Sequence, residues 1–190
     1  PLVDRQLCFG APERTDHKGA VVRALEDEEA QAIIRQIQEA KVDAVAVSLL
    51  FSFLNPVHEE TIRKMLNSLP SQPFVSISSD VLPEFREYER TTTVTINAYV
   101  GPVTSRYMKQ LEKQLNGQKL RVMQSSGGSI SAAQASEQPV RTILSGPAGG
   151  VVGAFWIASQ AGHDQIITLD MGGTSTDVSL CPGYIQETTT

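Results

Sequence analysis

Near the end of the sequence runs the stretch that decides the fold: Ile166-Ile167-Thr168-Leu169-Asp170-Met171-Gly172-Gly173-Thr174-Ser175-Thr176-Asp177-Val178-Ser179-Leu180. Its apolar residues 166–169 predict a strand, which delivers Asp170 to a sheet edge that solvent can reach. The two glycines predict a tight turn, because glycine adopts backbone angles closed to other residues. A second strand is expected over residues 177–180, so the stretch predicts a β-hairpin with an acidic residue on either side of its turn.

The turn of this hairpin has the chemistry of a phosphate-binding loop. Consecutive N–H groups form an anion-binding concavity, and three hydroxyl side chains add donors. We therefore predict that nucleotide phosphates contact the glycine and hydroxyl residues of the turn: Gly172, Gly173, Thr174, Ser175 and Thr176. A carboxylate beside phosphates is suited to hold Mg²⁺, usually through water. We assign this metal and catalytic role to Asp170. Asp177 is the second catalytic candidate, which holds Mg²⁺, orients water or only braces the turn.

Other motifs of nucleotide and ester chemistry are absent from the sequence. It contains no GxxxxGK[ST], no GxGxxG and no GxSxG, which argues against a Walker loop, a dinucleotide site and a nucleophile elbow. A β-hairpin with a plain Gly-Gly turn is the structural alternative. Such a turn needs neither two acids nor three hydroxyl residues at these spacings.

A glycine-rich helix is predicted over residues 146–161, directly before the hairpin. Ser145 is suited to cap this helix and Pro147 to stand in its first turn. Gly149 and Gly153 lie one turn apart, and each glycine inside a helix costs roughly 1 kcal/mol relative to alanine. We expect close backbone contact to offset this cost, either where the helix crosses between two domains or in simple core packing.

The first half of the chain alternates between helices and strands. Helical spacing of apolar residues predicts a helix over residues 27–40, capped by Asp27, and another over 56–69. Apolar runs predict a strand over 44–51, buried on both faces, and a strand over 74–77. This order is typical of an α/β fold with a largely parallel sheet. The remaining expected elements are a strand over residues 120–123 and helices over 84–100, 103–115 and 132–136, the first two separated by Gly101-Pro102.

Charge and composition limit the kinds of partner. The 190 residues carry a formal net charge of −5, which argues against nucleic-acid binding, because that needs clustered Lys and Arg. The charged run 84–90 favours a solvated helix face, with contact to substrate or a partner as the alternative. No segment reaches the ~20 apolar residues that span a bilayer, and Cys8 and Cys181 form no zinc motif. With no apolar leader, these features predict a cytoplasmic protein without a membrane segment.

Several stretches, taken together and in this order, resemble the hydantoinase A/oxoprolinase family, within the actin-like and hexokinase-like ATPase superfamily. They lie at residues 52–59 (SFLNPVHE), 82–91 (LPEFREYERT), 97–100 (NAYV), 123–128 (MQSSGG), 145–153 (SGPAGGVVG) and 170–178. The resemblance implies an α/β, ribonuclease-H-like or actin-like ATPase fold, here partial, with a mixed sheet flanked by helices.

The resemblance also implies a domain organisation. Residues 1–145 would be the rear part of a first ATPase-like domain, in which 1–80 end the family's N-terminal region and 81–145 begin the hydantoinase A region. Residues 146–162 would be the helix that crosses between domains. Residues 163–190 would begin a second ATPase-like domain that carries the phosphate loop.

The function that the resemblance implies is ATP-dependent and Mg²⁺-dependent attack on a cyclic amide, such as a hydantoin, an N-methylhydantoin or 5-oxoproline. The alternatives are a beta-type subunit of an ATP-dependent ketone carboxylase and a non-catalytic nucleotide-binding module. The family implies a hydantoinase B-type partner subunit or domain. It also has a further glycine-rich phosphate loop and an adenosine segment, which this sequence does not contain. We therefore expect these 190 residues alone to bind ATP poorly and to hydrolyse none.

Overall fold

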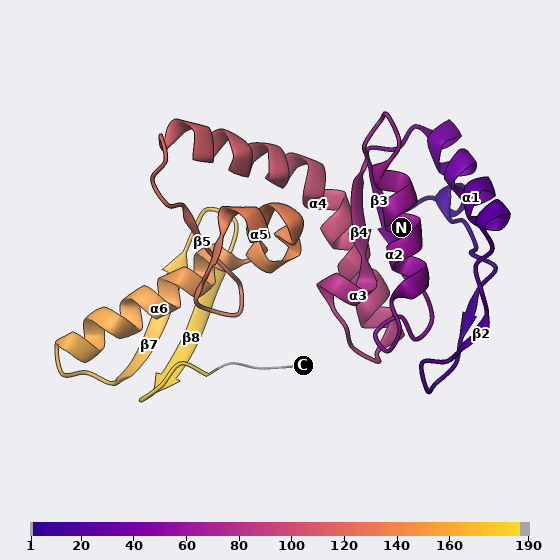
Figure 1. The fold of residues 1–190 in the computed structure, drawn as a ribbon. Helices are drawn as coiled ribbons and strands as arrows, with labels where there is room; N and C mark the ends of the chain where they lie inside the picture. Colours follow the sequence, from indigo (N-terminus) through magenta and orange to yellow (C-terminus); the bar gives the residue numbers. More distant parts are fainter. Residues whose placement is uncertain (1, 187–190) are drawn as a thin grey trace. The chain divides into compact units, whose positions relative to one another are not determined.

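The computed structural model describes residues 2–186 of the chain. The chain divides into two compact units, Pro1–Tyr107 and Met108–Thr190. Helices and short strands alternate along both units (Figure 1), which confirms the α/β class. The strands of the described residues pair as four two-stranded sheets, one parallel and three antiparallel. Within the same residues, no helix combines the length and apolar character needed to cross a bilayer.

A parallel strand pair organises the first unit. Strands β3 (Ala44–Val47) and β4 (Phe74–Ile77) pair in parallel over their full lengths. Helix α1 (Asp27–Ala40) precedes β3, and α2 (Val57–Asn67) connects β3 to β4, so the helix, strand, helix, strand prediction is confirmed. The buried apolar side chains of this core are Leu25, Ala30, Ile33, Ile34, Ile37, Val47, Ile62, Leu66 and Ile77.

Some details of these elements differ from the sequence prediction. The strand expected over residues 44–51 ends at Val47, and Ala46 is exposed, so the strand is not buried on both faces. The reason is that β3 belongs to a sheet of two strands, which leaves part of its surface uncovered. Asp27 is the first helical residue of α1 and not its cap; Glu26 holds the cap position without a side-chain hydrogen bond.

A short hairpin stands near the start of the chain. Its strands β1 (Arg14–Thr15) and β2 (Val21–Arg23) follow the 3-10 turn η1 (Arg5–Leu7). The Asp16 carboxylate accepts the N–H groups of Ala20 at 2.9 Å and Lys18 at 2.8 Å, which ties the turn together. These bonds, first that from Ala20 and then that from Lys18, lower the pKa of Asp16 below its ordinary value of 3.8.

One long helix replaces the two that the sequence predicts around Gly101-Pro102. After the single-turn helix α3 (Ser78–Val81), α4 runs without a break over Glu87–Gln114, with Pro102 inside it. Proline removes one backbone donor from a helix interior, but α4 accommodates that loss. Gly101 has a packing role here, because a Cβ atom on it would lie 2.4 Å from the Phe74 ring of β4. The Gly-Pro pair therefore marks a close approach of helix and strand, not a helix end.

The second unit begins with a compact antiparallel motif. Strands β5 (Arg121–Met123) and β6 (Ser129–Ser131) pair around the MQSSGG turn, and β6 was not expected from the sequence. Helix α5 (Ala132–Glu137) follows, and the 3-10 turn η2 (Pro139–Thr142) ends the motif. A small core lies beneath these elements, formed by Met108, Ile130 and Ala135 with Leu120 and Val122 packed against them.

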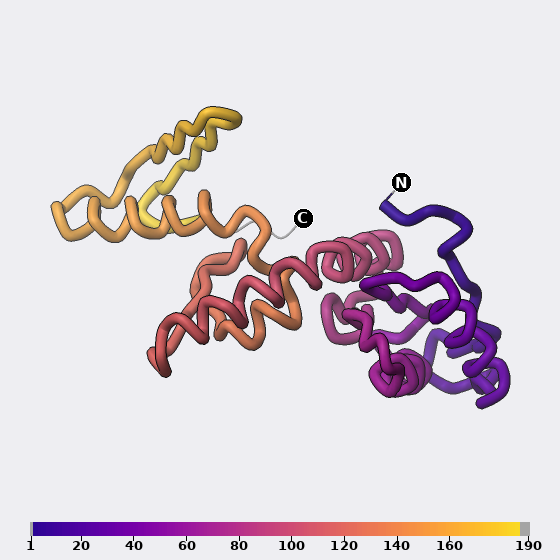
Figure 2. The backbone as a smooth tube through the Cα atoms, turned by 90° about the horizontal axis from the view of Figure 1, so that it is seen from above, coloured from indigo at the N-terminus to yellow at the C-terminus, as the bar shows by residue number. Residues whose placement is uncertain are grey.

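A helix and a long hairpin complete the second unit. Helix α6 (Ser145–Gln160) runs beside strands β7 (Gln165–Met171) and β8 (Thr176–Pro182) in both views (Figures 1 and 2). The predicted glycine helix and β-hairpin are thereby confirmed. Ser145 is the first helical residue and not the cap, because Leu144 holds that position in the left-handed region, with φ of 62°.

Candidate functional site

The turn between β7 and β8 is open to solvent. Residues 170–178 are all exposed. Within the described part of the chain, the turn has one backbone hydrogen bond of its own, from the Gly172 N–H to the Ser175 carbonyl, at 2.9 Å. Among the described residues, no hydrogen bond uses the amides of Gly173 and Thr174. A Cβ on Gly173 would meet nothing within 4 Å. The turn therefore offers free donors and room for a ligand.

The reason for glycine at this turn differs from the sequence expectation. Neither Gly172 nor Gly173 has a backbone φ in the left-handed region. The expected need for unusual backbone angles is therefore wrong, and the absence of a side chain is what these glycines contribute. Thr174, Ser175 and Thr176 follow them on the exposed rim of the hairpin.

Asp170 and Asp177 lie directly opposite each other on the two strands of the hairpin. Opposed residues in antiparallel strands share a face, with Cβ atoms about 4.5–5.5 Å apart, and like charges so placed are destabilising. In the part of the chain that the structure describes, neither carboxylate forms an ion pair with a basic side chain. The hydroxyl of Ser175 is 3.5 Å from Asp177 Oδ2. A cation between the two carboxylates would offset their repulsion.

The donor set at this position fits Mg²⁺. That ion binds through one or two carboxylates, keeps several waters and takes phosphate oxygens as its remaining ligands. The described residues contain no group of three or more His, Cys, Asp or Glu side chains that could enclose a metal. Asp170 and Asp177 would therefore hold Mg²⁺ together with water and phosphate, and not in an all-protein cage.

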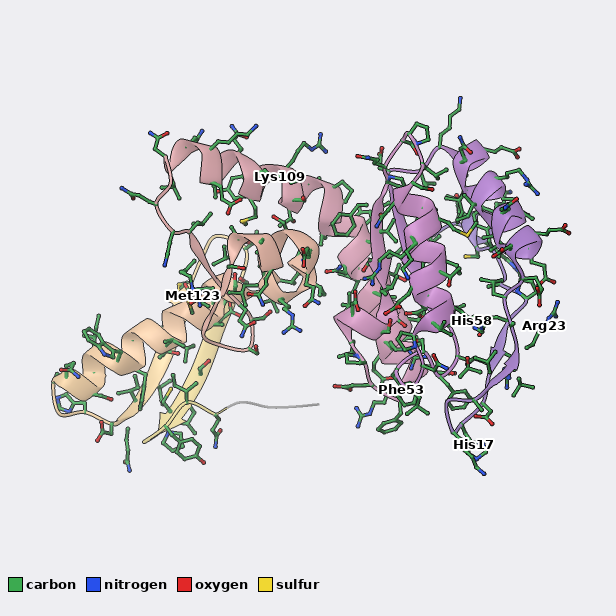
Figure 3. The ribbon with its side chains drawn as sticks, viewed as in Figure 1. His17, Arg23, Phe53, His58, Lys109 and Met123 are labelled. Atoms are coloured by element: carbon green, nitrogen blue, oxygen red, sulfur yellow. The ribbon has the colours of Figure 1, made fainter. Side chains whose placement is uncertain are left out.

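Helix α6 brings two glycines against the neighbouring motifs of the second unit. A Cβ on Gly149 would lie 3.7 Å from the Met123 side chain, which Figure 3 labels at the end of β5. A Cβ on Gly150 would lie 3.8 Å from Asp170 Oδ2. The segments that begin MQSSGG, SGPAGG and DMGG thus meet in one place. These distances are ordinary contacts, so the very close backbone approach expected for the glycines is not present at either position.

Two of the other stretches on which the family resemblance rests, 52–59 and 82–91, lie in the first unit around the loop after β3, which a buried carboxylate holds. Glu59 of α2 is fully buried. Its Oε1 accepts the Leu49 N–H at 2.9 Å and the Ser78 hydroxyl at 2.7 Å. Its Oε2 accepts the N–H and the hydroxyl of Ser79, at 2.9 and 2.8 Å. Ser52 extends the network through its hydroxyl, 3.0 Å from that of Ser78.

Arg90 of α4 completes this arrangement from the opposite side of Leu49. It is 1% exposed, so the expectation of a solvated face for residues 84–90 is wrong at this position. Its guanidinium donates to the carbonyls of Glu84 at 2.7 Å and Leu49 at 3.0 Å, and lies 5.3 Å from the centre of the Phe53 ring. Glu59 and Arg90 therefore hold the N–H and the carbonyl of one residue, Leu49, and fix the loop after β3.

Sequence reasoning missed both buried charges, although their spacing gave a signal. Glu59 lies on the buried stripe of α2 with Ile62 and Leu66, and Arg90 lies on that of α4 with Val94. A charged residue at a core position of a helix predicts a satisfied internal network, because an unpaired buried charge is costly. Neither residue lies near the phosphate loop in sequence, and we assign both a structural role.

Comparison with known proteins shows which family the chain is similar to. Residues 90–189 match the family model for hydantoinase/oxoprolinase, and residues 1–69 match that for the hydantoinase/oxoprolinase N-terminal region. The chain is 36% identical to caprolactamase subunit alpha of Pseudomonas jessenii over 186 residues, which is 96% of this chain and 27% of that protein. It is 31% identical to 5-oxoprolinase 1 of Arabidopsis thaliana over 201 residues, which is 97% of this chain and 16% of that protein.

A solved structure extends the similarity to the fold. The nucleotide-free structure of acetone carboxylase, an enzyme of ATP-dependent acetone carboxylation, superposes with a TM-score of 0.86 at 32% identity. The match covers 98% of this chain and 27% of that one, so the chain spans about a quarter of the length of such a relative. The predicted α/β, actin-like ATPase fold class is confirmed by this similarity. The described strands form separate two-stranded sheets, however, and not the single mixed sheet that was expected. Because one family model matches more than half of its residues, the chain belongs to the hydantoinase/oxoprolinase family.

Proposed function

We propose that the protein containing this chain uses ATP to activate a cyclic amide, and that the β7–β8 turn binds the nucleotide phosphates. The observation that carries the proposal is the exposed turn, with the unbonded amides of Gly173 and Thr174, beside the opposed carboxylates of Asp170 and Asp177. Backbone N–H groups of such a turn receive phosphate oxygens. The two carboxylates would hold Mg²⁺, which neutralises phosphate charge during transfer.

The chemistry explains why a lactam hydrolase would need a nucleotide. An unstrained lactam is a poor electrophile, because its nitrogen donates electron density to the carbonyl. Transfer of the γ-phosphoryl group to the amide oxygen releases ADP and leaves a carbon that water can attack. After water adds to this carbon, the C–N bond breaks, the ring nitrogen takes up a proton, and an acyl phosphate remains. A second water hydrolyses this acyl phosphate to the carboxylic acid and inorganic phosphate. The share of this chain would be to position phosphate and to neutralise its charge.

The relatives support a lactam substrate, because caprolactamase and 5-oxoprolinase are both named for one. A second candidate function is that of a subunit in an ATP-dependent ketone carboxylase. The superposition on acetone carboxylase over nearly the whole chain is the observation that favours it. Both candidates use the same nucleotide site and differ in the oxygen that is activated. Since a caprolactamase relative is itself a subunit, we propose that a hydantoinase B-type partner completes the enzyme.

The decisive experiment uses the full-length protein with its partner. ATP hydrolysis should be measured with hydantoin, N-methylhydantoin, 5-oxoproline, caprolactam and acetone, the last with bicarbonate. Stimulation by one cyclic amide, with matching ring opening, supports the first function, and stimulation by acetone supports the second. Replacing Asp170 with alanine should abolish stimulated hydrolysis while the far-ultraviolet circular dichroism stays unchanged. Asp164→Ala, on the exposed loop before β7, is the matched control. Full activity in Asp170→Ala would refute the assigned site.

A further inference from the structure

Gly150 is the residue of α6 that faces the candidate metal carboxylate. Among the described residues, and leaving aside its chain neighbours and the adjacent backbone of α6, only Asp170 Oδ2 would lie within 4 Å of a Cβ built on Gly150, at 3.8 Å. This is an ordinary van der Waals distance, so the backbone leaves room for alanine. The glycine is therefore not required by close packing among the described residues.

The absence of a side chain at this position has a thermodynamic cost that packing does not explain. Glycine in a helix interior is less favourable than alanine, because glycine loses more backbone conformational entropy on folding and leaves the helix backbone exposed to water. Gly153, one turn further along α6, would meet nothing within 4 Å and shares this cost. Gly150 differs from Gly153 in one respect: the atom it faces is a carboxylate oxygen of the proposed phosphate site.

A methyl group at Gly150 would change the surroundings of that oxygen. At 3.8 Å from Oδ2 it would be in van der Waals contact with this oxygen and would exclude water from that side of the carboxylate. It could neither donate a hydrogen bond nor coordinate a cation, so one approach to Oδ2 would be lost. Magnesium bound by carboxylates retains several waters, which need space around the carboxylate.

We propose that Gly150 is a positioning residue that keeps the α6 side of Asp170 Oδ2 open to the water shell of a phosphate-bound divalent cation. The inference rests on the proposed nucleotide function of the β7–β8 turn. It assigns to α6 a part in cation binding besides its place in the fold. It also gives helix stability and ligand binding opposite requirements at a single residue.

The test compares Gly150→Ala with Gly153→Ala in the full-length protein with its partner. Each variant is melted without ligand, and Mn²⁺·ADP binding is measured by calorimetry and by the Mn²⁺ electron paramagnetic resonance signal. Both substitutions should raise the melting temperature, because alanine favours the helix. Only Gly150→Ala should weaken Mn²⁺·ADP binding, by about tenfold, the loss of one good hydrogen-bonding interaction.

Three results would overturn the inference. The Asp170→Ala variant shows whether the role of Gly150 alone fails or the proposed metal site fails as well. Equal Mn²⁺·ADP affinity in both glycine variants refutes the role of Gly150, while a loss of affinity in Asp170→Ala still supports the nucleotide site. A lower melting temperature in Gly150→Ala without ligand assigns the glycine to packing instead. Wild-type affinity in Asp170→Ala removes the metal site itself, and the inference about Gly150 falls with it.

Discussion

Replacing Glu59 with alanine should destabilise the first unit strongly, because this buried carboxylate accepts from four donors. They are the backbone N–H groups of Leu49 and Ser79 and the hydroxyls of Ser78 and Ser79, all within 2.9 Å. The hydroxyls can rotate toward other acceptors, and that of Ser78 already has Ser52 as a neighbour. The two backbone N–H groups cannot rotate, and each buried donor left without an acceptor costs about 1–3 kcal/mol.

The expected loss is therefore about 2–6 kcal/mol in the free energy of unfolding of this unit, the sum for two orphaned amides. Glu59→Gln should lose less unfolding free energy than Glu59→Ala, since the oxygen of its amide still accepts from one pair of donors. Its NH₂ group faces the other pair, which loses its acceptor. Lys64→Ala, on the exposed face of the same helix, is the control and should change stability by no more than about 0.5 kcal/mol.

Hydrogen exchange measured by mass spectrometry under native conditions gives the most direct reading. Peptides covering Leu49 and Ser79 should exchange faster in Glu59→Ala, and urea denaturation should show the loss of stability. If the alanine variant loses less than about 1 kcal/mol, or if exchange at both amides is unchanged, the assigned network does not hold the loop.

Gly101→Ala should destabilise the first unit by about 1–3 kcal/mol in urea denaturation, because the new Cβ would lie 2.4 Å from the Phe74 ring. Phe74→Leu should restore part of the loss; additive losses in the double variant would contradict the contact. At Asp16 the folded-state pKa is lowered, so its stabilising effect on the β1–β2 turn is complete above pH 3.8 and disappears as the pH falls through the lower folded value. Nuclear magnetic resonance of the Lys18 amide should report that titration, and Asp16→Asn should abolish it. Ser131→Ala should cost about 0.5–2 kcal/mol, because Ser131 and Gln134 form a capping box at α5; unchanged urea denaturation would show that the cap contributes little.

The elements with strong periodicity were predictable from the sequence. Helix α1 and the β7–β8 hairpin lie where apolar spacing and the Gly-Gly turn placed them. Strand β6 was missed because its three residues, Ser-Ile-Ser, carry too short a pattern to distinguish a strand from a loop. The break expected at Gly101-Pro102 was wrong because tertiary contact with β4 overrode the local signal.

The candidate site was predictable in its members but not in its arrangement. Glycines and acids around the turn indicated a phosphate loop, and the structure leaves that turn exposed as the prediction requires. Sequence spacing alone did not show that Asp170 and Asp177 stand in one cross-strand pair, because that depends on the register of the hairpin. The proximity of Gly150 to Asp170 depends on how α6 packs beside β7, which no local pattern encodes.

The two faces of the β7–β8 hairpin have opposite character. The acidic pair lies on one face, and Ile167, Leu169, Met171, Val178 and Leu180 alternate onto the other, each at least 60% exposed. Inserting or deleting one residue between Gly172 and Ser175 would shift one strand past its partner, and a shift by one position exchanges the two faces of that strand. An acid would then stand among aliphatic side chains. A change in the length of this turn would therefore have two effects: it would alter the proposed ligand site, and it would move an acidic side chain onto the aliphatic face of the hairpin.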